Sequence, residues 1–214
     1  MSLLGADDLE RISEEIRPVL DDRFSAREKG ITGSRNVIRS SANAIRSLHR
    51  GEFDQAERLI SEAGSLLAEI TTALVDHQDI LHAGFVTDAA KEYAEARLTA
   101  AIFAGRPLPT ASELDLDPVP FLHGLGETVG ECRRRMLDQL RGGEIAEAER
   151  LLQAMDAIVD LLATMDYPDG MTSGLRRTTD VSRSLVERSR ADLTSTAVQE
   201  RLRADLERFG ADEA

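Results

Sequence analysis

The chain has 214 residues, with 39 Asp and Glu against 26 Lys and Arg, and its net charge is −13. This charge excludes non-specific adhesion of the whole surface to nucleic acid, because binding phosphates requires local positive potential. The single cysteine, Cys132, excludes an intrachain disulfide and a cysteine-based zinc site, and the four histidines contain no H-x-x-x-H pair. No basic-flanked apolar leader and no membrane-length apolar run occurs, so we expect a cytoplasmic protein that does not bind membranes.

The basic residues are almost all arginine, and the lysines are limited to Lys29 and Lys91. An acidic surface poor in lysine is typical of a salt-rich cytoplasm such as that of a halophilic archaeon. High genomic GC content produces the same arginine bias. No linker rich in Gly, Ser or Pro divides the sequence, so we expect residues 1–214 to form a single domain.

Helical periodicity recurs along the chain without strand alternation, which predicts an all-α fold. Pro18 separates the first two predicted helices, and Gly51 ends the second. The pair Asp117 and Pro118 is typical of an N-cap followed by the first residue of a helix. The predicted helices span residues 6–16, 18–50, 53–75, 82–105, 118–141, 142–165 and 172–209.

The predicted helix over residues 82–105 carries Asp88, Glu92 and Glu95 one turn apart. Like charges at this spacing weaken a helix slightly, so they indicate either a solvated face or a cation site. At about 100° per residue these acids share a side with apolar residues. The apolar residues are Leu81, Phe85, Ala96 and Phe103, and a row of small residues on the other side comprises Ala83, Ala90, Ala94 and Ala101.

An arginine face follows the predicted helix before Gly51. It comprises Arg35, Arg39, Arg46 and Arg50, whereas Val37, Ser41, Ile45 and Leu48 lie on a different side. Such a face is either solvated and paired with acids or a track for phosphates, to which arginine offers forked donors.

The predicted helix from Pro118 has an apolar stripe that comprises Leu122, Leu125, Val129, Met136 and Leu140. Periodicity places His123, Glu127, Glu131 and Arg134 largely away from this stripe, and it predicts that the two carboxylates face solvent. Gly126 and Gly130 form a G-x-x-x-G that favours close approach of another helix.

Several segments together resemble the translin/TRAX family. They are SRNVIRSSANAIRSLHR (34–50), LHAGFVTDAAKEYAEA (81–96), PVPFLHGLGETVGECRRRM (118–136) and, more loosely, LRRTTDVSRSLVERSRADL (175–193). The resemblance implies an all-α bundle of about seven helices. It also implies a homo-oligomeric, hollow shell of roughly eight subunits that binds single-stranded RNA or DNA.

In the TRAX-type nuclease subunit, acidic residues hold Mg²⁺ and cut RNA. The matching positions here are Glu92, Glu95, Glu127 and Glu131, so this chain resembles TRAX more than translin. Glu127 stands where the family pattern has Asp, which leaves both Mg²⁺ and Mn²⁺ as candidate ions. We expect a sheltered site without competing lysines.

The leading hypothesis is a Mg²⁺- or Mn²⁺-dependent endoribonuclease for single-stranded RNA, with Glu92, Glu95 and Glu127 as ligands and Glu131 as ligand or base. A second hypothesis is a noncatalytic shell that binds single-stranded nucleic acid through Arg35, Arg39, Arg46 and Arg50. A third is a helical scaffold whose acidic residues only keep it dissolved in salt.

Overall fold

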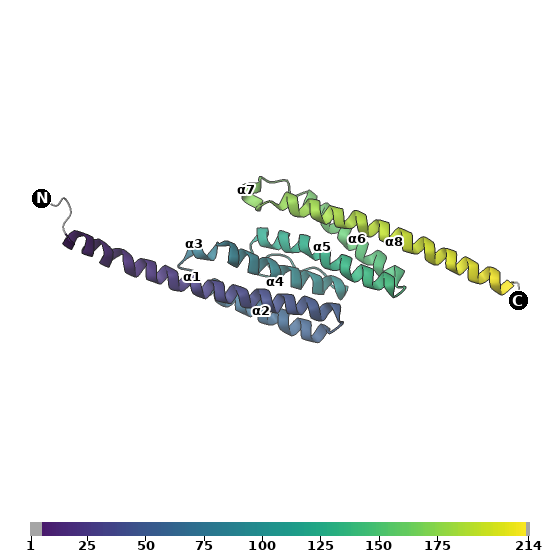
Figure 1. The fold of residues 1–214 in the computed structure, drawn as a ribbon, viewed down its shortest axis with the longest axis horizontal. Helices are drawn as coiled ribbons and strands as arrows, with labels where there is room; N and C mark the ends of the chain where they lie inside the picture. Colours follow the sequence, from purple (N-terminus) through teal and green to yellow (C-terminus); the bar gives the residue numbers. More distant parts are fainter. Residues whose placement is uncertain (1–5, 213–214) are drawn as a thin grey trace.

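The structure, a computed structural model, describes the backbone of residues 6–212, and these residues form helices and no strands (Figure 1). The all-α prediction is therefore confirmed. The helices are α1 (Ala6–His49), α2 (Phe53–Ala73), α3 (Gln78–Leu81), α4 (Gly84–Phe103), α5 (Pro118–Arg141), α6 (Ile145–Ala163), α7 (Asp169–Thr172) and α8 (Leu175–Asp212). Within the described part of the chain, no helix combines the length and the apolar character needed to cross a membrane.

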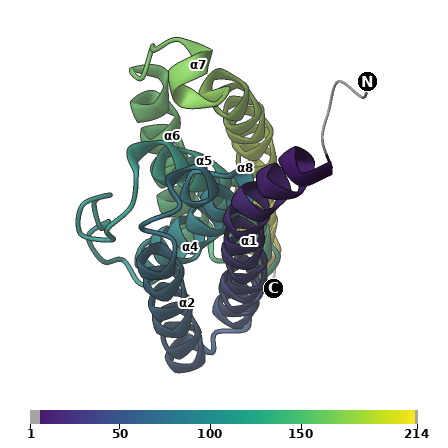
Figure 2. The ribbon, with the colours of Figure 1, turned by 90° about the vertical axis from the view of Figure 1, so that its left-hand side faces the viewer.

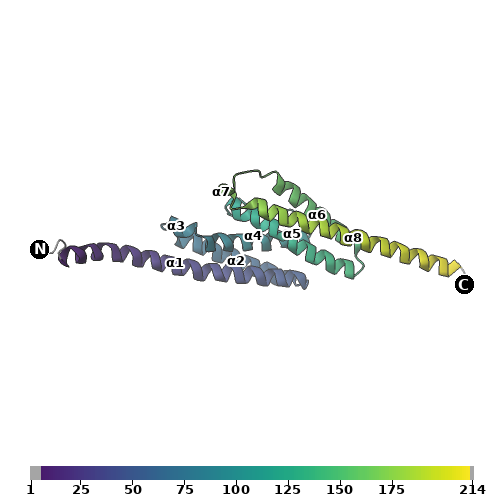
Figure 3. The same cartoon turned by 45° about the horizontal axis from the view of Figure 1, so that its top comes forward.

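Helices α4 and α5 join two halves of the molecule. On one side α4 packs against α1 and α2, and on the other α5 packs against α6 and α8. Seen end-on, α5 lies among α4, α6 and α8 (Figure 2). The first part of α1 and the last part of α8 project from opposite ends (Figures 1 and 3).

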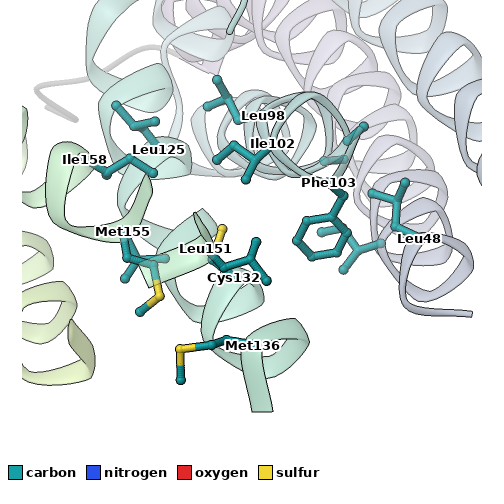
Figure 4. Close-up of a cluster of buried hydrophobic side chains, with 14 of the residues drawn as sticks. Leu48, Leu98, Ile102, Phe103, Leu125, Cys132, Met136, Leu151, Met155 and Ile158 are labelled. Carbon is teal, nitrogen blue, oxygen red and sulfur yellow. The ribbon is translucent and has the colours of Figure 1, made fainter. Parts of the chain in front are cut away.

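The larger hydrophobic core lies where α1, α4, α5 and α6 meet. Leu48, Phe103 and Met136 are among its buried residues (Figure 4). Cys132 lies in the same core, and burial raises the pKa of its thiol to about 12. This thiol is therefore protonated and shielded at neutral pH, which leaves the carboxylates as the reactive groups to consider.

Two predicted helix boundaries have clear structural causes. Gly51 ends α1 with φ +77°, a left-handed conformation that glycine adopts without strain. Asp117 caps α5, because its side chain accepts a hydrogen bond from the Val119 backbone N–H at 3.0 Å, and Pro118 is the first helical residue.

The predicted break at Pro18 is wrong, because α1 continues through this proline. Proline lacks an N–H donor and its ring crowds the carbonyl of residue i−4, so the carbonyl left without a partner belongs to Glu14. Residues 7–25 are exposed, so water can hydrate that carbonyl. The predicted seven helices therefore become six long ones, with single turns at α3 and α7.

Candidate metal centre on helices α4 and α5

Helix α4 places Glu92 and Glu95 on the side that faces α5. Glu95 is buried with 8 % of its surface exposed, and the Glu92 side chain keeps 26 %. Asp88, one turn earlier, is exposed and does not belong to the group of converging carboxylates. The acidic stripe thus divides into a solvated residue and a sheltered pair.

Helix α5 adds Glu127 to this pair. One carboxylate oxygen from each of Glu92, Glu95 and Glu127 lies within 4.8 Å of the other two. The Glu127 side chain keeps 38 % of its surface exposed, as periodicity predicts, but it also faces α4. The reason is that α5 is covered on several sides, so that a position outside its main apolar stripe can still face a neighbouring helix.

Gly124 brings the two helices close enough for this cluster to form. A Cβ atom at position 124 would lie 2.7 Å from the Lys91 carbonyl oxygen, 2.8 Å from Ala94 Cβ and 2.9 Å from the Glu95 nitrogen. Only glycine fits this crossing without displacement, and Ala94, from the predicted row of small residues, offers the matching surface. Glu127 follows Gly124 by almost one turn and so reaches the α4 pair.

Glu131 lies near the cluster but is bound elsewhere. Its Oε2 atom is 2.5 Å from His49 Nε2, and this contact joins α5 to α1. The His49 side chain is 6 % exposed and packs edge-on against Phe103, with ring centroids 5.4 Å apart. The prediction that Glu131 points to solvent is wrong, and the sequence offered no sign of its partner, because the contact spans 82 residues.

Lys91 occupies the edge of the cluster. Its ammonium nitrogen donates to Glu127 Oε1 at 2.8 Å and lies 3.5 Å from Glu92 Oε1. The expectation of a site without competing lysines is therefore wrong. Helical periodicity misses this contact because the long lysine stem lets the ammonium reach round from the adjacent position.

Negative charge dominates the cluster despite Lys91. Burial, followed by the charges of Glu127, Glu92 and Glu131, raises the pKa of Glu95 to about 8. Burial also raises the pKa of Glu92. Burial lowers the pKa of Lys91, but the hydrogen bond to Glu127 and the nearby carboxylates outweigh it, and the net direction is upward. At neutral pH the cluster therefore favours either a proton or an added cation.

The donor set fits a small hard cation. Mg²⁺ takes oxygen ligands at 2.0–2.1 Å, so two ligands across the ion are at most about 4.2 Å apart. The three carboxylates, with oxygens within 4.8 Å of one another, need only a small side-chain adjustment to meet this limit. The Lys91 ammonium would have to withdraw from Glu127.

The arginine face on α1 is exposed at all four predicted positions. Arg50 is neutralised by Glu52, with two contacts of 3.0 Å. Arg39 donates to the neutral side chain of Asn36 at 3.1 Å, and Arg46 bonds to that of Asn43. The Arg35 side chain has no hydrogen-bond or ion-pair partner among the side chains of residues 7–209. Three positive charges therefore stay uncompensated on this face.

Comparison with solved structures decides the family. A crystal structure of AfC3PO is 31 % identical to this chain, with a TM-score of 0.81, and the match covers 87 % of this chain and 97 % of that one. The structure of AfC3PO in complex with duplex RNA matches equally well, at 31 % identity and a TM-score of 0.81 over 87 % of this chain and 96 % of that one. The chain belongs to the translin-like C3PO family.

Two further relatives of this translin-like chain are more distant. An uncharacterized protein of Methanocaldococcus jannaschii is 26 % identical over 191 residues, which cover 88 % of this chain and 84 % of that protein. The structure of apo-NeC3PO, at 19 % identity and a TM-score of 0.76 over 92 % of this chain and 100 % of that one, shares the fold. No family model matches the sequence.

Proposed function

We propose that this translin-like chain is a metal-dependent endoribonuclease of the TRAX type that acts on single-stranded RNA in the cytoplasm. The observation that carries the proposal is the convergence of Glu92, Glu95 and Glu127 from two helices. The raised pKa of Glu95 supports it, because a buried carboxyl crowded by other carboxylates gains from a cation.

Each acidic residue has a role in this proposal. Glu92, Glu95 and Glu127 would hold Mg²⁺ or Mn²⁺, and a bound ion would supply an activated water and offset charge on the phosphate. Glu131 would accept the proton of the attacking water, with His49 fixing its carboxylate at 2.5 Å. The oxygens of Glu127 lie within 4.8 Å of those of the α4 pair, so Glu in place of the expected Asp remains compatible with the role of a ligand.

RNA would be held by the exposed arginine face of α1. Arg35, Arg39 and Arg46 keep their charge uncompensated, and arginine binds phosphate with forked donors. The complex of AfC3PO, the relative at 31 % identity, with duplex RNA supports nucleic-acid binding. The single-stranded preference comes from the family resemblance alone.

We also propose that the chain assembles into a homo-oligomeric, octamer-like shell. The projecting part of α1 exposes an apolar stripe with no covering helix, and the end of α8 exposes another. The stripes consist of Leu9, Ile12, Ile16, Val19, Leu20 and Phe24 on α1, and of Val198, Leu202, Leu206 and Phe209 on α8. Second copies of the chain would cover them.

A noncatalytic shell that binds single-stranded RNA or DNA is the second candidate. The observation that favours it is the ammonium of Lys91, which neutralises part of the acidic cluster without a metal. In that case the arginine face would still bind nucleic acid, and the carboxylates would be structural.

A cleavage assay separates the two candidates. Purified protein is incubated with 5′-labelled single-stranded RNA and Mg²⁺ or Mn²⁺, at low and at molar salt, beside a Glu92→Gln, Glu95→Gln double variant. The nuclease proposal expects cleavage by the wild type only, with RNA binding kept by the variant. RNA that is bound but intact in every condition would establish the noncatalytic shell. Thermal stability unaffected by RNA and by metal would instead favour a plain scaffold.

A further inference from the structure

We propose that Lys91 is a built-in competitor for the metal site, serving as counter-ion of the carboxylates in the metal-free protein and leaving when a divalent ion binds. The inference rests on the proposed metal site. It goes further, because it assigns the control of metal affinity to Lys91, a residue that is not a metal ligand.

The position of Lys91 supports this role. Its nitrogen lies 2.8 Å from Glu127 Oε1 and 3.5 Å from Glu92 Oε1, so it contacts carboxylates from both helices. The side chain is only 22 % exposed, although a lysine ammonium is normally well solvated. The other lysine, Lys29, lies exposed on α1. The chain therefore has one of its two lysines at the edge of the acidic cluster.

An ammonium and a divalent ion cannot share these oxygens. Both would occupy the space beside Glu127, where their positive charges repel each other at short range in a partly buried site. The four-carbon stem of lysine lets its charge swing out to solvent, whereas a guanidinium would fill more of the space. Metal binding is then an exchange, in which the ion must replace the stabilisation that Lys91 provides.

This exchange has two consequences. Removing the charge of Lys91 should strengthen metal binding, because the ion no longer displaces a competitor. The same change should destabilise the metal-free protein, because the carboxylates of Glu92 and Glu127 lose their cation. A lysine with only a structural role would produce the second effect without the first.

The test measures Mn²⁺ binding by titration calorimetry, and thermal unfolding with a chelator, for full-length Lys91→Met and Lys91→Gln. Two uncharged variants of different polarity guard against a folding defect in one. Lys29→Met is the matched control, since it removes the same charge at a distant exposed position. We expect Mn²⁺ affinity to rise roughly tenfold in both Lys91 variants, with a lower metal-free Tm, and no change in the control.

The outcomes separate the two proposals. If the wild type binds Mn²⁺ and the Lys91 variants bind it no more tightly, the competitor role is overturned and the metal site stands. If neither the wild type nor the variants bind Mn²⁺, the metal site and the competitor role both fail. A metal-free Tm unchanged in both variants would overturn the counter-ion role.

Discussion

Glu95 lies in an environment that disfavours its ionised form. Its carboxyl group is buried, three other carboxylates raise its pKa, and Lys91 offsets them only in part. Such a residue costs stability whenever it ionises without a partner. Packing alone does not require a carboxylate here, because glutamine has nearly the same size, and this supports the proposed cation.

The pH dependence of stability tests the environment of Glu95 directly. Its pKa is about 8 in the folded protein and 4.5 without the fold, so the folded state binds the proton more tightly. Proton binding by Glu95 therefore stabilises the folded state fully below pH 4.5. This contribution declines as pH rises through neutrality and is lost above pH 8. The full contribution to the free energy of unfolding should reach a few kcal/mol, because each tenfold difference in proton affinity corresponds to about 1.4 kcal/mol.

The measurement is urea unfolding of metal-free protein between pH 5 and pH 9, compared with Glu95→Gln. Other groups titrate over this range in both proteins, so the difference between the two curves isolates Glu95. We expect the variant to gain stability relative to the wild type as pH rises. Parallel curves would show that Glu95 titrates normally.

At the scale of elements, the crossing of α4 and α5 determines whether the carboxylates meet. Gly124→Ala should place a methyl group 2.7–2.9 Å from α4 atoms, two of which belong to the backbone and cannot rotate away. Overpacking of this kind costs about 1–3 kcal/mol. We expect reduced stability in denaturant unfolding and weaker Mn²⁺ binding by calorimetry, because the helices must separate.

Gly130→Ala is the matched control on the same helix. A Cβ at this position would meet nothing nearer than Leu185 Cδ1 at 4.0 Å. Alanine is better than glycine inside a helix by roughly 0.5–1 kcal/mol, so this variant should be neutral or stabilised. Equal losses in both variants would mean that the crossing at Gly124 has no special role.

The sequence predicted the long helices because their caps and apolar stripes are local. Asp117 and Gly51 act within a few residues, so their effects can be inferred from neighbours. The approach of Glu127 to α4 and the contact of Glu131 with α1 could not be inferred in this way, because α5 has helices on several sides and periodicity identifies only one apolar stripe. The predicted break at Pro18 failed for a related reason. Helix propensity does not reveal whether water can hydrate the carbonyl that proline leaves without a hydrogen-bond partner.

The candidate site follows the same rule. The α4 pair was visible in the spacing of Glu92 and Glu95, and the resemblance supplied Glu127 and Glu131. His49 and Lys91 were missed, because one contacts the site from α1 and the other depends on the reach of a flexible stem. The G-x-x-x-G prediction holds at Gly126, where a Cβ would clash with Thr178, but not at Gly130, where the nearest atom would be 4.0 Å away.

At the scale of the whole molecule, the projecting part of α1 has an apolar stripe that the chain itself leaves uncovered. We expect the triple variant Leu9→Gln, Ile12→Gln, Ile16→Gln to form smaller assemblies than the wild type. Burying polar side chains between copies of the chain no longer yields the favourable free energy of burying apolar surface. Light scattering after size-exclusion chromatography measures the mass. Glu10→Gln, Glu14→Gln, Arg17→Gln is the control on the same segment, and an unchanged mass in the first variant would exclude this stripe from the assembly.

The net charge of −13 means that RNA binding must depend on a local positive surface, which the arginine face of α1 offers. Replacing Arg35, Arg39 and Arg46 with alanine should weaken RNA binding. It should also reduce the slope of log affinity against log salt by about 2, since each phosphate contact on a single strand contributes roughly 0.7. Fluorescence anisotropy with labelled RNA from 50 mM salt upwards measures both quantities.

The control replaces Arg201, Arg203 and Arg208, which are exposed on α8 and change the net charge equally. An equal loss in both triple variants would assign the effect to net charge, and a slope retained by the α1 variant would place the RNA elsewhere.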